Sequence, residues 1–246
     1  MRPNFVKRQR MKKNLKKWVL LLMTIITLPV TAMAQDKVEA NVGADLVSGY
    51  IWRGQDFGGV SIQPSISVSY KGLSLSAWGS VGINGEDAKE LDLTLAYEIG
   101  NFSISVTDFW CVPNGEDVKY FKYGAHSTAH VFEAQIGYDF GIFALNWYTN
   151  FAGADGVNKD GDRAYSSYVN LIAPFNLGGL EWEAEIGATP WATDYYVNTN
   201  GFAVCDISLS TSKEIKITEN YSLPVYAKAT FNPAADKAYL TFGLSF

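Results

Sequence analysis

Apolar and polar residues alternate along most of the chain after residue 35. Between residues 60 and 71, every even-numbered position is apolar or proline: Val60, Ile62, Pro64, Ile66, Val68 and Tyr70. The odd-numbered positions are polar. A period of two residues is the pattern of a β-strand with one apolar and one polar face. No helical period of 3.6 residues appears after residue 35. The pattern therefore predicts an all-β fold.

The same alternation recurs about twelve times, and each occurrence predicts one strand. The predicted strands are 38–53, 60–71, 73–83, 89–99, 101–110, 130–140, 142–151, 163–173, 180–190, 202–211, 221–231 and 237–246. The links between them are alternately short, such as 71–72 and 141, and long, such as 111–129 and 152–162. This layout is typical of an up-and-down antiparallel transmembrane β-barrel with an even strand number, tight periplasmic turns, larger outer loops and both termini in the periplasm.

A soluble sandwich or a lipocalin-like barrel also has strands of period two, with the apolar face inward. The polar faces here favour a membrane barrel, because they are small or charged and suit a wet lumen. Aromatic residues also gather near the predicted strand ends, as expected of two interfacial girdles. The predicted outer girdle contains Tyr50, Trp52, Trp110, Phe132, Phe151, Trp191, Phe202 and Phe231, and the periplasmic girdle contains Tyr70, Tyr97, Phe102, Phe140, Phe143, Tyr221 and Phe246.

The last predicted strand places Leu240, Phe242, Leu244 and Phe246 at two-residue steps. A strand that ends on an aromatic residue resembles the assembly signal of bacterial outer-membrane barrels. The expected partners are therefore the barrel-assembly machinery and outer-membrane lipids. A sheet exposed to a bilayer must also close, because an open edge leaves backbone groups unpaired in lipid.

The chain is 48% hydrophobic and 18% charged, with a net charge of −5. Eight of its 20 basic side chains and none of its 25 acidic ones lie in residues 1–34. A basic segment, an apolar run from Trp18 to Val30, and Ala32 and Ala34 at small-x-small spacing predict a cleaved signal peptide over 1–34, with Met11 as an alternative start. The barrel domain, 35–246, then has 12 basic and 25 acidic side chains and a net charge of −13. Such an acidic chain is not expected to bind nucleic acid. The signal peptide predicts export, and together with the barrel pattern it predicts the outer membrane of a Gram-negative bacterium.

The alternation places mostly acidic residues on the inward face. The candidate pore-lining residues are Asp45, Arg53, Asp92, Glu98, Glu133, Asp139, Glu181, Glu183, Glu185, Asp206 and Lys228. Such a lumen favours cations and predicts passive diffusion of small hydrophilic solutes. The alternative is a closed barrel in which Arg53 and Lys228 pair with carboxylates and the outer loops 111–129, 152–162 and 191–201 bind a ligand or partner. Asp108 does not fit, because the alternation places it on the apolar face.

One short motif resembles a known family. Ser48-x-Tyr50-x-Trp52-Arg53-Gly54, followed by Pro64, resembles the TorF-type putative porin family. The resemblance implies a small exported barrel, covers about ten residues, and implies no catalytic residue.

The remaining candidate chemistry is sparse. His126 and His130 have the spacing of a helical zinc pair, but no helix is predicted there. Ser127 next to His126 leaves open an outer-membrane lipid-modifying enzyme, although no nucleophile motif accompanies it. The segment 155–162 resembles part of a calcium loop without its closing Glu, which favours a surface turn. Cys111 and Cys205 fall on strands that are not neighbours, with Cys205 predicted to face lipid. We therefore predict no catalytic residue, metal site or cofactor.

Overall fold

A computed structural model describes residues 37–85, 87–124 and 127–246. The predicted signal peptide, 1–34, and His126 lie outside the described residues. All the strands belong to one compact unit, Val38–Phe246. The described residues form strands and turns without a helix, and so without a helix of the length and hydropathy of a membrane span.

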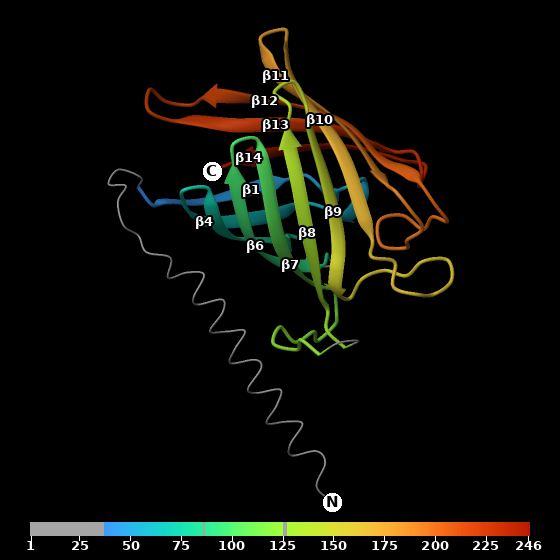
Figure 1. The fold of residues 1–246 in the computed structure, drawn as a ribbon. Helices are drawn as coiled ribbons and strands as arrows, with labels where there is room; N and C mark the ends of the chain where they lie inside the picture. Colours follow the sequence, from blue (N-terminus) through green and yellow to red (C-terminus); the bar gives the residue numbers. More distant parts are fainter. Residues whose placement is uncertain (1–36, 86, 125–126) are drawn as a thin grey trace, which may run out of the picture. The chain divides into compact units, whose positions relative to one another are not determined.

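Twelve of the fourteen strands pair antiparallel, each with its neighbour, into a closed barrel, which confirms the predicted architecture (Figure 1). The other two strands, β2 and β3, form a separate hairpin. The barrel strands are β1 (Glu39–Val47), β4 (Ser61–Tyr70), β5 (Leu73–Gly82), β6 (Lys89–Ile99), β7 (Phe102–Val112), β8 (His130–Asp139), β9 (Ala144–Gly153), β10 (Ser167–Leu177), β11 (Leu180–Thr189), β12 (Ala203–Lys216), β13 (Ser222–Asn232) and β14 (Lys237–Ser245).

The alternation of residue types decides which face of each strand points outward. In β4, Ile62 and Ile66 are exposed on the outside of the barrel, whereas Ser61 and Gln63 are buried inside it. The same division holds around the wall, where the exposed side chains are mainly Leu, Ile, Val and Phe and the buried ones mainly Ser, Thr, Asn, Asp and Glu. The barrel therefore has an apolar outer surface and a polar interior, the reverse of a soluble core.

The barrel closes between β1 and β14. The two strands pair from Asp45 to Val47, in register with Gly243–Ser245, and Ala44 and Phe246 exchange two further backbone hydrogen bonds. Ser48 extends the junction, because its backbone N–H donates to the Phe242 carbonyl oxygen at 2.9 Å and its hydroxyl accepts from the Phe242 N–H at 3.0 Å. β1 begins and β14 ends at the end of the barrel that carries the short turns, which we call the short-turn end; the opposite end is the long-loop end.

Three predicted strand boundaries were wrong. The strand predicted over 38–53 ends at Val47, because Ser48 and Gly49 turn the chain and the hairpin of β2 (Tyr50–Trp52) and β3 (Gln55–Gly58) follows. The strand predicted from residue 163 begins at Ser167, after a left-handed Tyr165 with φ of 47° interrupts the extended backbone. The strand predicted over 202–211 extends as β12 to Lys216, where it pairs with Ser222 in a long hairpin.

Candidate functional site

The hairpin of residues 50–58, which we call the lumen hairpin, is the first long loop of the barrel. Trp52 pairs with Gln55 across a two-residue turn, Arg53-Gly54. Both turn residues have positive φ, 50° for Arg53 and 76° for Gly54, as a tight hairpin turn of type I′ requires. The turn is narrow enough to fit inside the barrel, with Arg53 at its tip.

The tip of the lumen hairpin lies against β12 and β13. Asn232 at the end of β13 donates from Nδ2 to the Gly54 carbonyl oxygen at 3.0 Å. A Cβ atom at Gly54 would lie 1.8 Å from the carbonyl oxygen of Cys205 in β12. Glycine is therefore required twice at this position, by the positive φ and by the close approach of two backbones.

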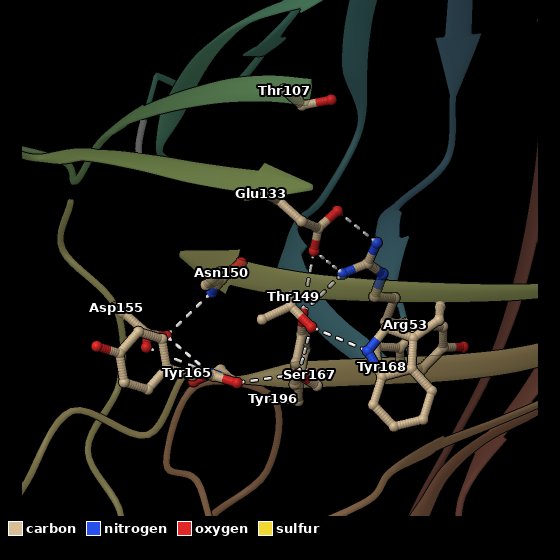
Figure 2. A network of polar contacts seen from close by, with 12 residues as sticks. Arg53, Thr107, Glu133, Thr149, Asn150, Asp155, Tyr165, Ser167, Tyr168 and Tyr196 are labelled. Atoms are coloured by element: carbon tan, nitrogen blue, oxygen red, sulfur yellow. Dashed lines mark hydrogen bonds and ion pairs between the residues drawn. The ribbon is translucent and has the colours of Figure 1, made fainter. Parts of the chain in front are cut away.

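From the hairpin tip, the Arg53 guanidinium group reaches Glu133 of β8 (Figure 2). Its Nη1 and Nη2 atoms donate to the two carboxylate oxygens of Glu133 at 2.5 and 2.9 Å. Only 9% of the Arg53 side chain and 4% of the Glu133 side chain are exposed. The pair is thus a bidentate, desolvated ion pair between the hairpin tip and the barrel wall.

Four aromatic rings surround the same guanidinium group. The distances from the Arg53 Cζ atom to the ring centroids are 4.2 Å for Trp52, 4.1 Å for Tyr148, 4.7 Å for Tyr168 and 5.4 Å for Tyr196. Tyr148 belongs to β9 and Tyr168 to β10, whereas Tyr196 lies in the loop between β11 and β12. All four are within the range of a cation–π contact. We call Glu133, Tyr148, Tyr168 and Tyr196 the guanidinium cage.

Tyr196 connects the cage to an outer loop. Its hydroxyl accepts from Arg53 Nη1 at 2.8 Å and donates to Glu133 at 3.1 Å. Burial raises the pKa of Tyr196 well above its ordinary value, so the phenol keeps its proton and can donate to the carboxylate. The long loop 190–202 therefore folds into the barrel and closes over the hairpin tip.

Tyr50 and Trp52 were predicted to face outward in the outer girdle, and this prediction was wrong. Tyr50 packs on Trp78 with ring centroids 5.4 Å apart, and Trp52 packs on Phe109 at 5.7 Å. Trp78 and Phe109 share the inward register of Ser65 and Asp92. Because Ser48 and Gly49 end β1, the two rings enter the lumen instead of continuing along the outer face.

Side chains fill the lumen around the lumen hairpin. Tyr168, Tyr196 and Cys205 form a buried cluster, against which Trp52 and Tyr148 pack. The first two are 1% and 2% exposed, although they point into the interior of a barrel. The lumen is therefore closely packed at this level.

Below the cage, a polar belt continues around the wall towards the short-turn end. Glu185 accepts from Lys228 Nζ at 3.3 Å, from the Tyr168 hydroxyl at 3.1 Å and from Asn170 Nδ2 at 2.7 Å. Asn170 in turn accepts from Asn146 at 3.1 Å. Both inward cations named in the sequence analysis thus have carboxylate partners, Arg53 with Glu133 and Lys228 with Glu185.

The interior is more open near the short turns. A cavity of about 330 Å³ lies there, lined by Glu181, Glu183, Ser210, Ser212, Tyr226 and Lys228 among others. Glu181 and Glu183 are exposed in this cavity, and no salt bridge to either is formed within the described residues. This chamber, lined by carboxylates and hydroxyls, shares Lys228 with the polar belt.

The remaining candidate pore-lining residues occupy three settings. Asp45, Asp92 and Asp206 lie on the inward face of β1, β6 and β12, in register with inward Gln63, Trp78 and Gly187. Glu98 is exposed near the end of β6. Asp139 is exposed at a short turn, where its carboxylate accepts from the Gly141 N–H at 2.7 Å, so it caps a turn.

Asp108 lies on the outer face, in register with Leu93 and Phe132, and its carboxyl group contacts His130. The Asp108 Oδ1 atom is 2.6 Å from His130 Nδ1, and His130 Nε2 donates to the Tyr120 carbonyl oxygen at 2.6 Å. Tyr123 stacks on the imidazole at a centroid distance of 4.2 Å. The loop segment 113–124 is therefore held at the outer wall by His130, which is 0% exposed. The spacing His126–His130 gave no hint of this arrangement.

The structure revises the predicted placement of Cys205 and agrees with the surface turn expected over 155–162. Cys205 was predicted to face lipid, but it occupies a β-bulge, since Gly187 pairs with Asp206 and Ala188 with Val204. The extra residue turns Cys205 into the interior cluster. In 155–162, the Asn158 side chain accepts from the backbone N–H groups of Asp160 and Asp162 at 2.9 and 3.0 Å, which makes the segment a turn.

Comparison with known proteins adds little beyond the fold. No family model and no curated protein matches the chain. Among solved structures, a NanC porin is similar at a TM-score of 0.40 and 10% sequence identity, over 84% of this chain and 98% of that one. The barrel assignment therefore rests on the strand pairing of the chain itself.

Proposed function

We propose that the protein is a barrel of the bacterial outer membrane that passes small hydrophilic solutes by diffusion and prefers cations. The observation that carries the proposal is the closed barrel with an apolar outer surface and a polar interior. In a bilayer, closure satisfies every strand edge, and the apolar face meets lipid. Twelve strands lie between small barrels filled by side chains and wide porins, a size that suits a narrow, selective lumen.

The lumen hairpin is the proposed point of control. Solutes that enter the acidic chamber at the short-turn end reach the polar belt and then the guanidinium cage, where Arg53 and the surrounding rings occupy the lumen. Passage thus requires the hairpin tip to move. Ser48, Tyr50, Trp52, Arg53 and Gly54, on which the resemblance to the TorF-type family depends, all belong to this hairpin or to its junction with β14, so we propose that the motif defines a lumen plug.

A closed barrel is the second candidate, and the packing around the cage favours it. If the hairpin never leaves, the protein is a scaffold for its outer loops. The loops 154–166 and 190–202 are joined for such a role, since the Val157 N–H donates to Asp194 Oδ1 at 2.7 Å and the Asp194 N–H donates to the Val157 carbonyl oxygen at 3.2 Å.

A lipid-modifying enzyme finds less support in the geometry. The Asp108–His130 pair lies on the outer face, where a lipid substrate would be, but His130 Nε2 is already bonded to the Tyr120 carbonyl oxygen. A nucleophilic hydroxyl would need that nitrogen as its base.

Planar-bilayer recording of the purified protein separates the first two candidates. The channel proposal predicts discrete current steps with a reversal potential that indicates cation preference. The protein could instead insert into the bilayer and show heat-modifiable gel mobility but never conduct. That result would reject the channel proposal and support the closed barrel.

A further inference from the structure

We infer that the guanidinium cage is a binding site for guanidinium groups of small organic solutes and that Arg53 is a built-in occupant of that site. The inference deepens the proposed function, because it names the class of cation that the lumen selects, and it rests on that function for the passage of the solute. The binding itself is independent of conduction.

The cage belongs to the barrel and not to the hairpin. Glu133, Tyr148 and Tyr168 lie on three adjacent strands, β8, β9 and β10, and Tyr196 comes from the loop 190–202. None of these four residues is part of the lumen hairpin. Withdrawal of the hairpin would remove Arg53 and Trp52 but leave the carboxylate and three of the four rings in place.

An empty cage would require a cation. The Glu133 side chain is 4% exposed, and a buried carboxylate without a partner is strongly unfavourable. The only cationic group that bonds to it within the described residues is Arg53. A solute that carries its own guanidinium group can therefore replace Arg53 at little electrostatic cost, whereas an anion or a neutral solute cannot.

The geometry favours guanidinium over simple ammonium. The two Glu133 oxygens accept from two different nitrogens of one planar group, a fork that an ammonium group does not provide. The Arg53 Cζ atom lies over the Tyr148 ring, 4.1 Å from its centroid, within the range of a cation–π contact. The acidic chamber with Glu181 and Glu183 lies on the short-turn side of the cage and attracts the same cations.

Cys205 gives a direct readout of the occupant. It is 0% exposed and lies in the buried cluster with Tyr168 and Tyr196, against which Trp52 of the hairpin packs, and its backbone carbonyl oxygen faces Gly54 at the hairpin tip. Withdrawal of the hairpin removes Trp52 and Gly54 from this cover, so a thiol reagent reacts with Cys205 faster. In a Cys111→Ser background in detergent, ethylguanidinium competes with Arg53. We expect it to accelerate Cys205 labelling by a small neutral methanethiosulfonate at least tenfold, with saturation, while KCl and urea at the same concentrations do not. In Glu133→Gln, labelling is fast and ethylguanidinium has no further effect.

Arg53→Ala removes the competitor and reports binding to the cage. We expect ethylguanidinium at millimolar concentration to raise the temperature of its heat-modifiable transition, and ethylammonium and KCl to do so much less. Adding Glu133→Gln to this variant should abolish the difference. If Arg53→Ala does not fold, Arg53→Lys serves instead, since a lysine holds the cage without the bidentate fork and is displaced at lower ethylguanidinium concentration than arginine.

Equal effects of ethylguanidinium and KCl in both assays would overturn the inference and reduce Arg53 to an anchor of the hairpin. Bilayer recording of Arg53→Ala separates this failure from that of the proposed function. If ethylguanidinium binds in detergent but no current is recorded, solute passage is rejected and the binding site is supported. If a potassium current is recorded that ethylguanidinium does not interrupt, the channel is supported and the binding site is rejected.

Discussion

The Glu133→Gln substitution tests whether one ion pair holds the lumen hairpin in place. The carboxylate accepts two hydrogen bonds from Arg53 and one from Tyr196, and both charged side chains are less than one-tenth exposed. Glutamine keeps one acceptor oxygen but turns an NH₂ group towards a guanidinium nitrogen. Removal of one partner from a buried pair costs about 3–5 kcal/mol, because the other charge is left uncompensated.

The cost is expected in the hairpin and not in the barrel. Arg53 can recover its hydration if the hairpin withdraws, whereas the barrel is held by backbone pairing between all twelve strands. A loss of about 3 kcal/mol from the closed state corresponds to a roughly 100-fold increase in the open population, at about 1.4 kcal/mol per factor of ten. Cys205 then becomes more accessible, because Trp52 of the hairpin leaves the cluster in which Cys205 is buried.

The assay is the rate of Cys205 labelling in a Cys111→Ser background. Heat-modifiable gel mobility of the unlabelled protein checks that the barrel is folded. The expected result is acceleration by about two orders of magnitude, as the loss of the buried pair implies. Glu183→Gln is the matched control, since it makes the same chemical change on an exposed inward residue. An unchanged rate in Glu133→Gln, or an equal rise in the control, would refute the assignment of the ion pair as the fastening of the hairpin.

Three further changes test other parts of the account. Gly54→Ala should displace the hairpin and raise conductance severalfold, because its Cβ would lie 1.8 Å from a backbone oxygen; an unaltered current would contradict the tight contact. Glu181→Gln with Glu183→Gln should shift the reversal potential towards lower cation preference without altering the fold, and a constant potential would remove these residues from the selectivity mechanism. His130→Ala should free the loop segment 113–124 from the outer wall, at a cost of about 1–3 kcal/mol for the lost buried bonds, and increase trypsin cleavage within it about tenfold or more. Equal cleavage in both proteins would show that His130 does not hold this segment.

The barrel itself could be predicted from the sequence because its strands obey one rule. Alternation such as Val60 to Tyr70 depends only on which face meets water, and the alternation of short and long links follows from antiparallel neighbours. Twelve strands, their approximate ranges and the inward parity of Asp45, Asp92 and Asp206 all follow from that rule.

The lumen hairpin escaped the rule because its residues continue the parity of the strand before it. Leu46, Tyr50 and Trp52 are separated by even numbers of residues. The apolar alternation therefore continues through Ser48-Gly49, and the end of the strand there leaves no mark in the sequence pattern. Arg53-Gly54 was the available signal, since a glycine in the second position suits a two-residue hairpin turn. What no local pattern contains is the partner of Arg53, because Glu133 lies 80 residues away in the chain.

Cys205 and Asp108 show the same limit in two forms. A β-bulge shifts the alternation of inward and outward side chains by one residue, and the residue types around Cys205 do not predict the bulge. Asp108 keeps its parity, but the loop that covers it is positioned by His130 on the next strand and by a backbone carbonyl of Tyr120. Both depend on contacts between segments that only the folded barrel brings together.

The most direct measurement of the central claim is the conductance of the wild-type barrel beside a variant in which a short glycine-serine linker replaces residues 50–58. The account predicts a small or intermittent, cation-preferring current from the wild type and a larger, steady one from the variant, because the hairpin is the part that fills the lumen. Equal conductance of the two proteins, or no current from either once both are shown to be inserted and folded, would contradict it.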